Sequence, residues 1–229
     1  MSESDVSAKP ETRIFLTFDF EDNFMDLDRL AQDFNDKVHS VKLGQGFLLD
    51  ERAHKITKRL LAHGTTLYLD AKYIDDPDQM ASQVRTVASM GFSYVSVSPS
   101  AGRESLIAAG RAQEGIKVVA AFSADVEMNR IETRKVRGAN RKLDDEHKIE
   151  IGMCNVLCIE RIKSLGNFSV IATGIRMPED DRNDQPSVMT PAQALSLGAD
   201  YLAIGRAITA HSDRHAAFDR ILENIASVG

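Results

Sequence analysis

Short apolar runs alternate with amphipathic segments along almost the whole chain. The apolar, β-prone runs fall at residues 14–20, 38–43, 66–72, 94–98, 117–123, 149–153, 168–173 and 201–204. Apolar residues at helical spacing predict helices at residues 25–35, 51–63, 77–90, 103–113, 156–165, 191–197 and 215–225. Nearly continuous apolar runs are typical of parallel strands that are buried on both faces. Eight such strands on 229 residues predict an α/β protein with a (β/α)8 TIM barrel fold.

The segments outside this alternation are polar. Residues 1–13 lack the apolar run of a signal peptide, so we expect a disordered N-terminal extension, followed by a single barrel domain at 14–229. Residues 128–148 carry many acidic and basic side chains, which is typical of a solvated helix and loop. No run approaches the roughly 20 apolar residues of a membrane span, so no membrane partner is expected.

Composition narrows the class of protein further. A hydrophobic content of 43% with 27% charged residues is ordinary for a soluble globular protein. The net charge of -6 argues against a nucleic acid polymer as partner. The two cysteines, Cys154 and Cys158, have the spacing of one helix face, and we expect them to be buried thiols in a reducing compartment. These features predict a cytoplasmic protein, and no spacing typical of metal ligands occurs.

The third apolar run ends in three ionisable residues, Asp70, Lys72 and Asp75. Alternate residues of a strand share a face, so Asp70 and Lys72 are expected to project to the same side. Asp75 lies past the strand end, where the turn before Pro77 can aim it elsewhere. An exposed strand end with a surface ion pair is the plain alternative. A catalytic charge cluster is the functional one.

Charged residues also follow other predicted strands, at Asp19, Lys42 and Arg206. In a barrel, the carboxyl ends of the strands surround one mouth, where active sites lie. Residues scattered in the sequence therefore form a ring in space, which favours the functional interpretation of the third strand.

Two segments near the end of the chain are suited to a phosphate. Gly205 and Arg206 stand where the last strand meets its helix, so free amide groups and a guanidinium fork can bind a dianion there. The connection from Thr173 to Pro191 is long enough to be a lid that brings Arg176 and Gln185 onto the ligand.

These motifs together resemble the orotidine 5'-monophosphate decarboxylase family over nearly the whole chain after the N-terminal extension. The resemblance is carried by the following pieces: Phe18-Asp19, Val41-Lys42-Leu43-Gly44, Leu69-Asp70-Ala71-Lys72-Tyr73-Ile74-Asp75-Asp76-Pro77, Thr173-Gly174-Ile175-Arg176, Asp184-Gln185, Thr190-Pro191, Gly198-Ala199-Asp200-Tyr201 and Gly205-Arg206. The Asp-x-Lys-x-x-Asp element is shared with sugar-phosphate decarboxylases and aldolases of the same suprafamily. The lid motifs favour the orotidylate branch.

The resemblance implies a role for each matching residue. The catalytic residues would be Lys42, Asp70, Lys72 and Asp75, with Lys72 protonating C6 of the pyrimidine. Asp75 would reach the neighbouring subunit's site, so a homodimer with shared active sites is implied. The ribose would be held by Asp19 and Lys42. The phosphate and lid contacts would come from Arg176, Gln185, Gly205 and Arg206. The implied ligand is a pyrimidine nucleotide, with no metal or organic cofactor.

The chain departs from the family where the ring would be recognised. Residues 98–102 read Ser-Pro-Ser-Ala-Gly in place of a His-Ala pair before the glycines, and Val126-Glu127-Met128 aligns with the family's Thr-Ser-Met. Glu127 would then face the ring, where an ionised carboxylate prefers an amino donor.

Several functions remain open from the sequence. The chain could decarboxylate orotidine 5'-monophosphate to UMP, or another modified pyrimidine nucleotide in a specialised pathway. A nucleotide-binding relative without turnover is a different class of protein. A sugar-phosphate decarboxylase or aldolase of the suprafamily would depend on Mg2+.

Overall fold

Eight parallel strands close into a barrel in the order in which they occur in the chain. The computed structural model describes residues 10–18, 27, 29, 33–34, 37–164 and 166–228. The strands are β1 (Ile14–Phe18), β2 (Ser40–Gly44), β3 (Leu67–Tyr73), β4 (Tyr94–Val97), β5 (Lys117–Ala121), β6 (Ile151–Asn155), β7 (Ser169–Thr173) and β8 (Tyr201–Ile204). The barrel closes where Ile14 pairs with Leu202, and the predicted α/β barrel is confirmed.

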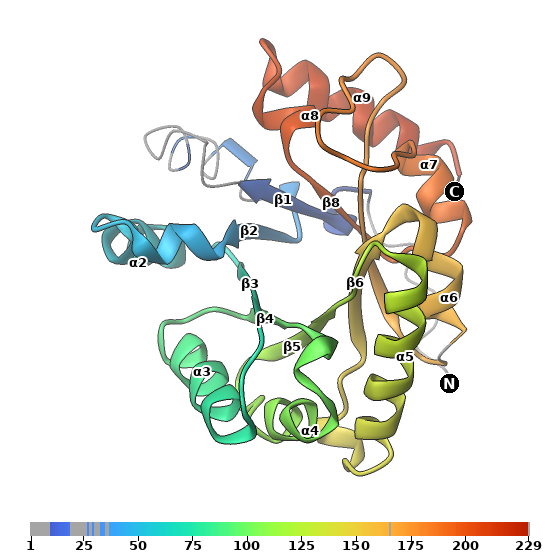
Figure 1. Cartoon of the computed structure of the whole chain (residues 1–229). Helices are drawn as coiled ribbons and strands as arrows, with labels where there is room; N and C mark the ends of the chain where they lie inside the picture. The colour runs from blue at the N-terminus through green and yellow to red at the C-terminus, as the bar shows by residue number, and fades with distance from the viewer. Residues whose placement is uncertain are drawn as a thin grey trace, which may run out of the picture.

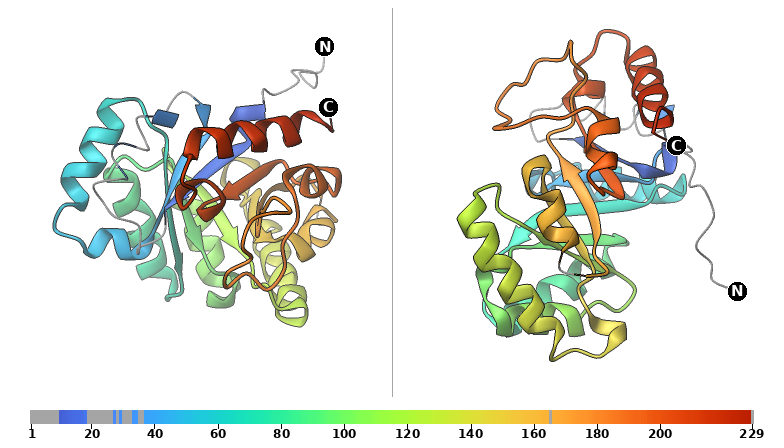
Figure 2. Two further views of the ribbon diagram at one scale, coloured as in Figure 1. Left: turned by 90° about the horizontal axis from the view of Figure 1, so that it is seen from above. Right: turned by 90° about the vertical axis from the view of Figure 1, so that its right-hand side faces the viewer.

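Helices cover the outside of the barrel (Figures 1 and 2). They are α2 (Ala53–Ala62), α3 (Pro77–Ser89), α4 (Arg103–Arg111), α5 (Val126–Asn140), α6 (Ile159–Lys163), α7 (Pro191–Ser196), α8 (Arg206–Thr209) and α9 (Arg214–Ala226). Short 3-10 turns lie at η1 (Pro10–Arg13), η3 (Gln45–Leu49), η4 (Pro99–Ala101), η5 (Asp145–His147) and η6 (Val156–Cys158). Among the described residues, no helix is long and apolar enough to cross a membrane.

Side-chain caps fix where the longer helices begin. The Asp76 carboxylate accepts the Gln79 N–H at the start of α3, and Asp125 accepts the Met128 N–H at the start of α5. At α7, Thr190 and Gln193 cap each other's backbone, and Pro191 occupies the first turn. These caps set the points at which the chain leaves the barrel mouth and enters each helix.

Aromatic side chains fill the amino-terminal half of the barrel interior. The Phe15 ring makes edge contacts with Tyr68, Tyr94 and Tyr201, at centroid distances of 5.8, 5.5 and 5.4 Å. Tyr94 and Tyr201 are the first residues of their strands, so this plug lies at the strand beginnings. The carboxyl ends of the strands are therefore left for the polar residues.

The structure also corrects two sequence predictions. Cys154 lies on β6 and Cys158 on η6, so they do not share a helix face, although both are buried. Burial raises the pKa of the Cys154 thiol. The segment predicted as a solvated helix and loop does form a helix, α5, followed by a loop with η5, but the inner face of α5 is buried at Asn129, Glu132 and Val136. Because several residues of that inner face are polar, the sequence did not indicate that the face is buried.

Some predictions fall outside the described residues. Most of the helix expected at residues 25–35 lies there, and so do Asp19 and residues 1–9 of the predicted extension.

Candidate active site

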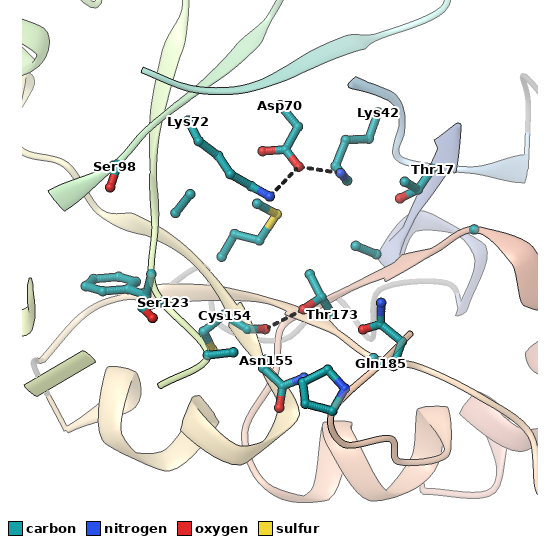
Figure 3. A pocket seen from close by; sticks show the side chains of 18 of the residues that line it. Thr17, Lys42, Asp70, Lys72, Ser98, Ser123, Cys154, Asn155, Thr173 and Gln185 are labelled. Atoms are coloured by element: carbon teal, nitrogen blue, oxygen red, sulfur yellow. Dashed lines mark hydrogen bonds and ion pairs between the residues drawn. The ribbon is translucent and has the colours of Figure 1, made fainter. Parts of the chain in front are cut away.

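A cavity of about 900 Å³ opens among the carboxyl ends of the strands. It is lined at each strand end, with Thr17, Lys42, Asp70, Ser98, Ser123, Asn155, Thr173 and Gly205 among its residues. Side chains that are scattered in the sequence therefore share one cavity, and Figure 3 shows several of them converging on it.

Two lysines flank Asp70 in this cavity. Lys42 Nζ lies 2.6 Å from Asp70 Oδ2, and Lys72 Nζ lies 3.7 Å from the same oxygen (Figure 3). The Asp70 side chain is only 7% exposed, whereas that of Lys72 is 60% exposed. The Lys42–Asp70 ion pair is thus buried at the bottom of the array, whereas the exposed Lys72 ammonium can contact a ligand in the cavity.

The second Asp70 oxygen is held by Ser96. Ser96 Oγ donates to Asp70 Oδ1 at 2.8 Å and accepts the Lys72 N–H at 2.8 Å. Burial acts to raise the pKa of Asp70, but the charges of Lys42 and Lys72 and the hydrogen bonds from Lys42 and Ser96 outweigh it. The net result is a lowered pKa, so Asp70 is a carboxylate at neutral pH.

Lys72 adopts a backbone conformation that strands rarely use. Its φ is 50°, and the register between β3 and β4 shifts between Leu69 and Tyr73. A non-glycine residue in the left-handed region is strained and persists only when its surroundings hold it, as the Ser96 hydrogen bond does here. Simple alternation along a strand predicted that Asp70 and Lys72 would meet. The structure brings them together through this irregular backbone.

Asp75 does not line the cavity of its own chain. Asp75 Oδ1 accepts the Asp76 N–H and Asp75 Oδ2 accepts from Gln83 Nε2, both at 3.0 Å. The neighbouring Ile74 is 64% exposed and does line the cavity. The carboxylate is therefore held at the outer edge of the mouth, facing helix α3.

The residues expected at the phosphate end meet at the lid. Arg176, Gln185, Gly205 and Arg206 all line the cavity. Arg206 pairs with Asp184, and its hydrogen bond lowers the pKa of that carboxyl. The guanidinium groups of Arg176 and Arg206 thus lie at one end of the cavity, where their positive charge favours an anion.

Backbone hydrogen bonds fold the lid onto itself. Met189 donates its N–H to Gly174 O, and Arg176 donates its N–H to Met189 O, each at 3.0 Å. The Arg176 side chain is buried, with Nε donating to Asp181 O at 2.9 Å and Nη1 to Ile175 O at 2.8 Å. Arg176 therefore braces the lid as well as lining the cavity.

Gly174 gives a direct test of this lid geometry. Its φ is +85°, and an added Cβ would lie 2.6 Å from Ser187 O. Gly174→Ala is expected to lower the free energy of unfolding by about 1–3 kcal/mol because it combines backbone strain with a clash. Gly44→Ala is the matched control, since Gly44 has a φ of -68° and nothing lies within 4 Å of its added Cβ. Equal denaturation midpoints for the two variants would contradict this account of the lid.

Glu127 is not brought into the cavity. Its side chain is 76% exposed and pairs with Arg130 at 3.5 Å. The residues that line the cavity directly after β5 are Phe122, Ser123 and Ala124, and Met128 and Glu132 of α5 line it as well. Glu127 itself therefore lies outside the cavity, although its neighbour Met128 lines it.

A different glutamate, Glu132, lines the cavity beside Ser123. It lies on α5, is 2% exposed, and accepts from Ser100 Oγ at 2.9 Å and from the Ser123 N–H at 2.7 Å. Glu132 was not predicted from the sequence, because it stands within a run of charged residues. Its only signal was helical spacing from Asn129 and Val136 on the inner face of α5. Across the described residues, no three His, Cys, Asp or Glu side chains gather as a metal-binding group.

Comparison with known proteins gives a consistent result. Residues 12–221 match the family described as "Orotidine 5'-phosphate decarboxylase / HUMPS family". An orotidine 5'-phosphate decarboxylase from Saccharophagus degradans is 27% identical, over 95% of each chain. One from Prochlorococcus marinus is 32% identical, over 75% of this chain and 79% of its own. The crystal structure of orotidine 5'-phosphate decarboxylase from Pyrococcus horikoshii superposes with a TM-score of 0.74 at 20% identity, covering 93% of this chain and 99% of that one, which supports the barrel fold.

Proposed function

The chain belongs to the orotidine 5'-phosphate decarboxylase / HUMPS family, and from this premise we propose that it decarboxylates orotidine 5'-monophosphate to UMP. The observation that carries the proposal is the Lys42–Asp70–Lys72 array in a cavity that also contains a phosphate-binding end. The implied setting is pyrimidine nucleotide biosynthesis in the cytoplasm.

The array favours the transition state over the bound substrate. A substrate carboxylate next to ionised Asp70 is poorly placed, because two negative charges then lie close together. When the C6–carboxylate bond breaks, CO2 leaves and the electron pair stays on C6. The Lys72 ammonium then stabilises the carbanion and donates a proton to C6, which gives UMP. Lys72 regains its proton from solvent, to which its side chain is 60% exposed.

Lys42 positions the array. Its ammonium lies 2.6 Å from Asp70 Oδ2 and its side chain is only 7% exposed, so it keeps Asp70 ionised and fixed. Binding energy from the phosphate end, at Gly205 and Arg206, can close the lid and hold the ring over Lys72.

The direct test is to mix the purified protein with orotidine 5'-monophosphate and follow the ring absorbance as UMP forms. Turnover that saturates with substrate is expected. Tight binding of pyrimidine nucleotides without turnover would instead indicate a binding protein. Turnover that depends on added Mg2+ and stops with a chelator would favour a sugar-phosphate enzyme of the suprafamily.

Replacing Arg206 is expected to weaken the phosphate contact. Arg206→Ala removes a charge-assisted hydrogen bond of about 1.5–3 kcal/mol, so kcat/KM for orotidine 5'-monophosphate should fall about 10- to 150-fold. Orotidine lacks the phosphate, so the wild-type protein and the Arg206→Ala variant should use it equally poorly. Arg182→Ala is the control, since Arg182 is an exposed lid residue that bonds Pro186 O. A similar loss with both arginines would contradict a phosphate role specific to Arg206.

We further propose that the active enzyme is a homodimer in which Asp75 completes the partner's site. Asp75 sits at the edge of the mouth beside the exposed Ile74, and both follow directly from β3. A second chain packed on this edge would bring the carboxylate to a Lys72 that is not its own.

A further inference from the structure

Helix α5 holds the peptide groups of Ser123 with two side chains. The Ser123 N–H donates to Glu132 Oε2 at 2.7 Å, and the Ser123 carbonyl accepts from Asn129 Nδ2 at 3.1 Å. The Ser123 hydroxyl oxygen accepts the Asp125 N–H at 3.1 Å. These bonds leave the hydroxyl hydrogen of Ser123 as a donor toward the cavity, while its N–H is already used.

Glu132 also joins two loops of the mouth. Its Oε1 accepts from Ser100 Oγ, on the connection after β4, and its Oε2 binds the connection after β5. Within the part of the chain that the structure describes, no lysine, arginine or histidine forms a salt bridge with Glu132. Both Glu132 oxygens therefore accept hydrogen bonds from neutral donors, and each has a further lone pair that can accept another hydrogen bond at the cavity wall.

This wall lies across the mouth from the phosphate end. In the closed barrel, β4 is four strands away from β8 in either direction, and the charge array on β2 and β3 lies between them. Ser98 and Ser123 stand on one side of the cavity, and Thr17 and Gln185 on the other (Figure 3). A nucleotide whose phosphate is anchored at Arg206 and whose C6 is at Lys72 therefore extends its ring edge toward Ser123 and Glu132.

We propose that Glu132 is a specificity-determining residue, which shifts the pocket's preference toward a pyrimidine with an amino group at this edge and away from one with a carbonyl oxygen. The inference rests on the proposed function, because it places a pyrimidine nucleotide in the site. An amino group can donate to the carboxylate, and the Ser123 hydroxyl can donate to a ring nitrogen beside it. A carbonyl oxygen meets acceptor oxygens of Glu132 and a Ser123 N–H that is already occupied.

The test measures the dissociation constants of UMP and CMP, which differ only at this edge of the ring. Glu132→Gln replaces the carboxylate with an amide, whose oxygen can still accept the Ser123 N–H and whose NH2 group can donate to a carbonyl oxygen. It is expected to change the ratio of the two constants about tenfold in favour of UMP. Glu127→Gln is the matched control, since Glu127 is on the same helix, exposed and outside the cavity. It should leave the ratio unchanged.

An unchanged ratio in Glu132→Gln, or a shift toward CMP, would overturn the proposal. So would equal weakening of both nucleotides, which a purely structural role predicts, or a lack of binding of both to the wild-type protein. If Glu132→Gln does not fold, Ser100→Ala frees Oε1 for the ligand and should move the ratio toward CMP, and no movement would count against the idea. A wild-type protein that fails to decarboxylate orotidine 5'-monophosphate, but whose ratio shifts as expected, would refute the proposed function alone.

Discussion

Lys72→Ala is expected to reduce the rate of decarboxylation by at least about 10⁴-fold, because one side chain supplies both the proton and the charge that stabilises the carbanion. The affinity for UMP should change little, since the phosphate end is untouched and the product has no carbanion. The measurement is kcat from the ring absorbance, together with a dissociation constant for UMP. A large loss of kcat with retained binding is the signature of a group that acts in the transition state.

The fold should survive this substitution. Lys72 is 60% exposed, and Asp70 keeps its contact with Lys42 at 2.6 Å when Lys72 is removed. Lys58→Ala on α2 is a matched control, because it deletes an exposed lysine away from the cavity. A Lys72→Ala protein that kept more than about a tenth of its activity would rule out this lysine as the proton donor.

The strands and helices of the barrel could be predicted from the sequence, because local hydrophobic patterns determine them. Buried parallel strands need continuous apolar runs, and the helices between them need one apolar face, so the period of the pattern changes at each boundary. Strand β6 was expected to begin at residue 149 but begins at Ile151, where its pairing with Ser169 of β7 starts. Ile149 is buried although it lies before the strand. Such shifts depend on register between strands, which a single sequence does not contain.

The candidate site was predicted where spacing fixes the position of a side chain, and missed where tertiary contacts fix it. Lys42, Asp70 and Lys72 each stand near a strand end, so the barrel topology places them at one mouth, although the contact between Asp70 and Lys72 also depends on the irregular backbone at Lys72. Glu132 stands on a helix eleven residues after the last residue of β5, and it reaches the cavity only because α5 turns its inner face toward that loop. Within this run of charged residues, only helical spacing from Asn129 and Val136 distinguishes the inward-facing Glu132 from the exposed Glu127.

The left-handed backbone of Lys72 has the same origin. Neither the residue type nor its neighbours favour a φ of 50°, and lysine is not enriched in that region. The conformation is stabilised by the Ser96 side chain, which is 24 residues away and joins the Lys72 N–H to Asp70. A strained residue held by a polar network in a cavity is typical of a functional site.

The proposed sharing of active sites between two subunits gives the second large expected effect. Asp70→Asn and Asp75→Asn should each remove most of the activity, since one takes a charge from the array and the other from the partner's array. In an equal mixture of the two, half of the dimers contain one chain of each kind. One site in each such dimer then has both carboxylates intact, so about a quarter of the wild-type activity should return.

A second mixture separates this arrangement from one in which each chain completes its own site. The double variant Asp70→Asn with Asp75→Asn is mixed equally with the wild-type protein, and activity is measured after the subunits have been shown to exchange. Shared sites leave about a quarter of the activity, because every mixed dimer is inactive, whereas self-contained sites leave about half. No recovery in the first mixture together with half activity in the second would place Asp75 in its own chain's site. That result would conflict with its hydrogen bond to Gln83 and its position outside the cavity.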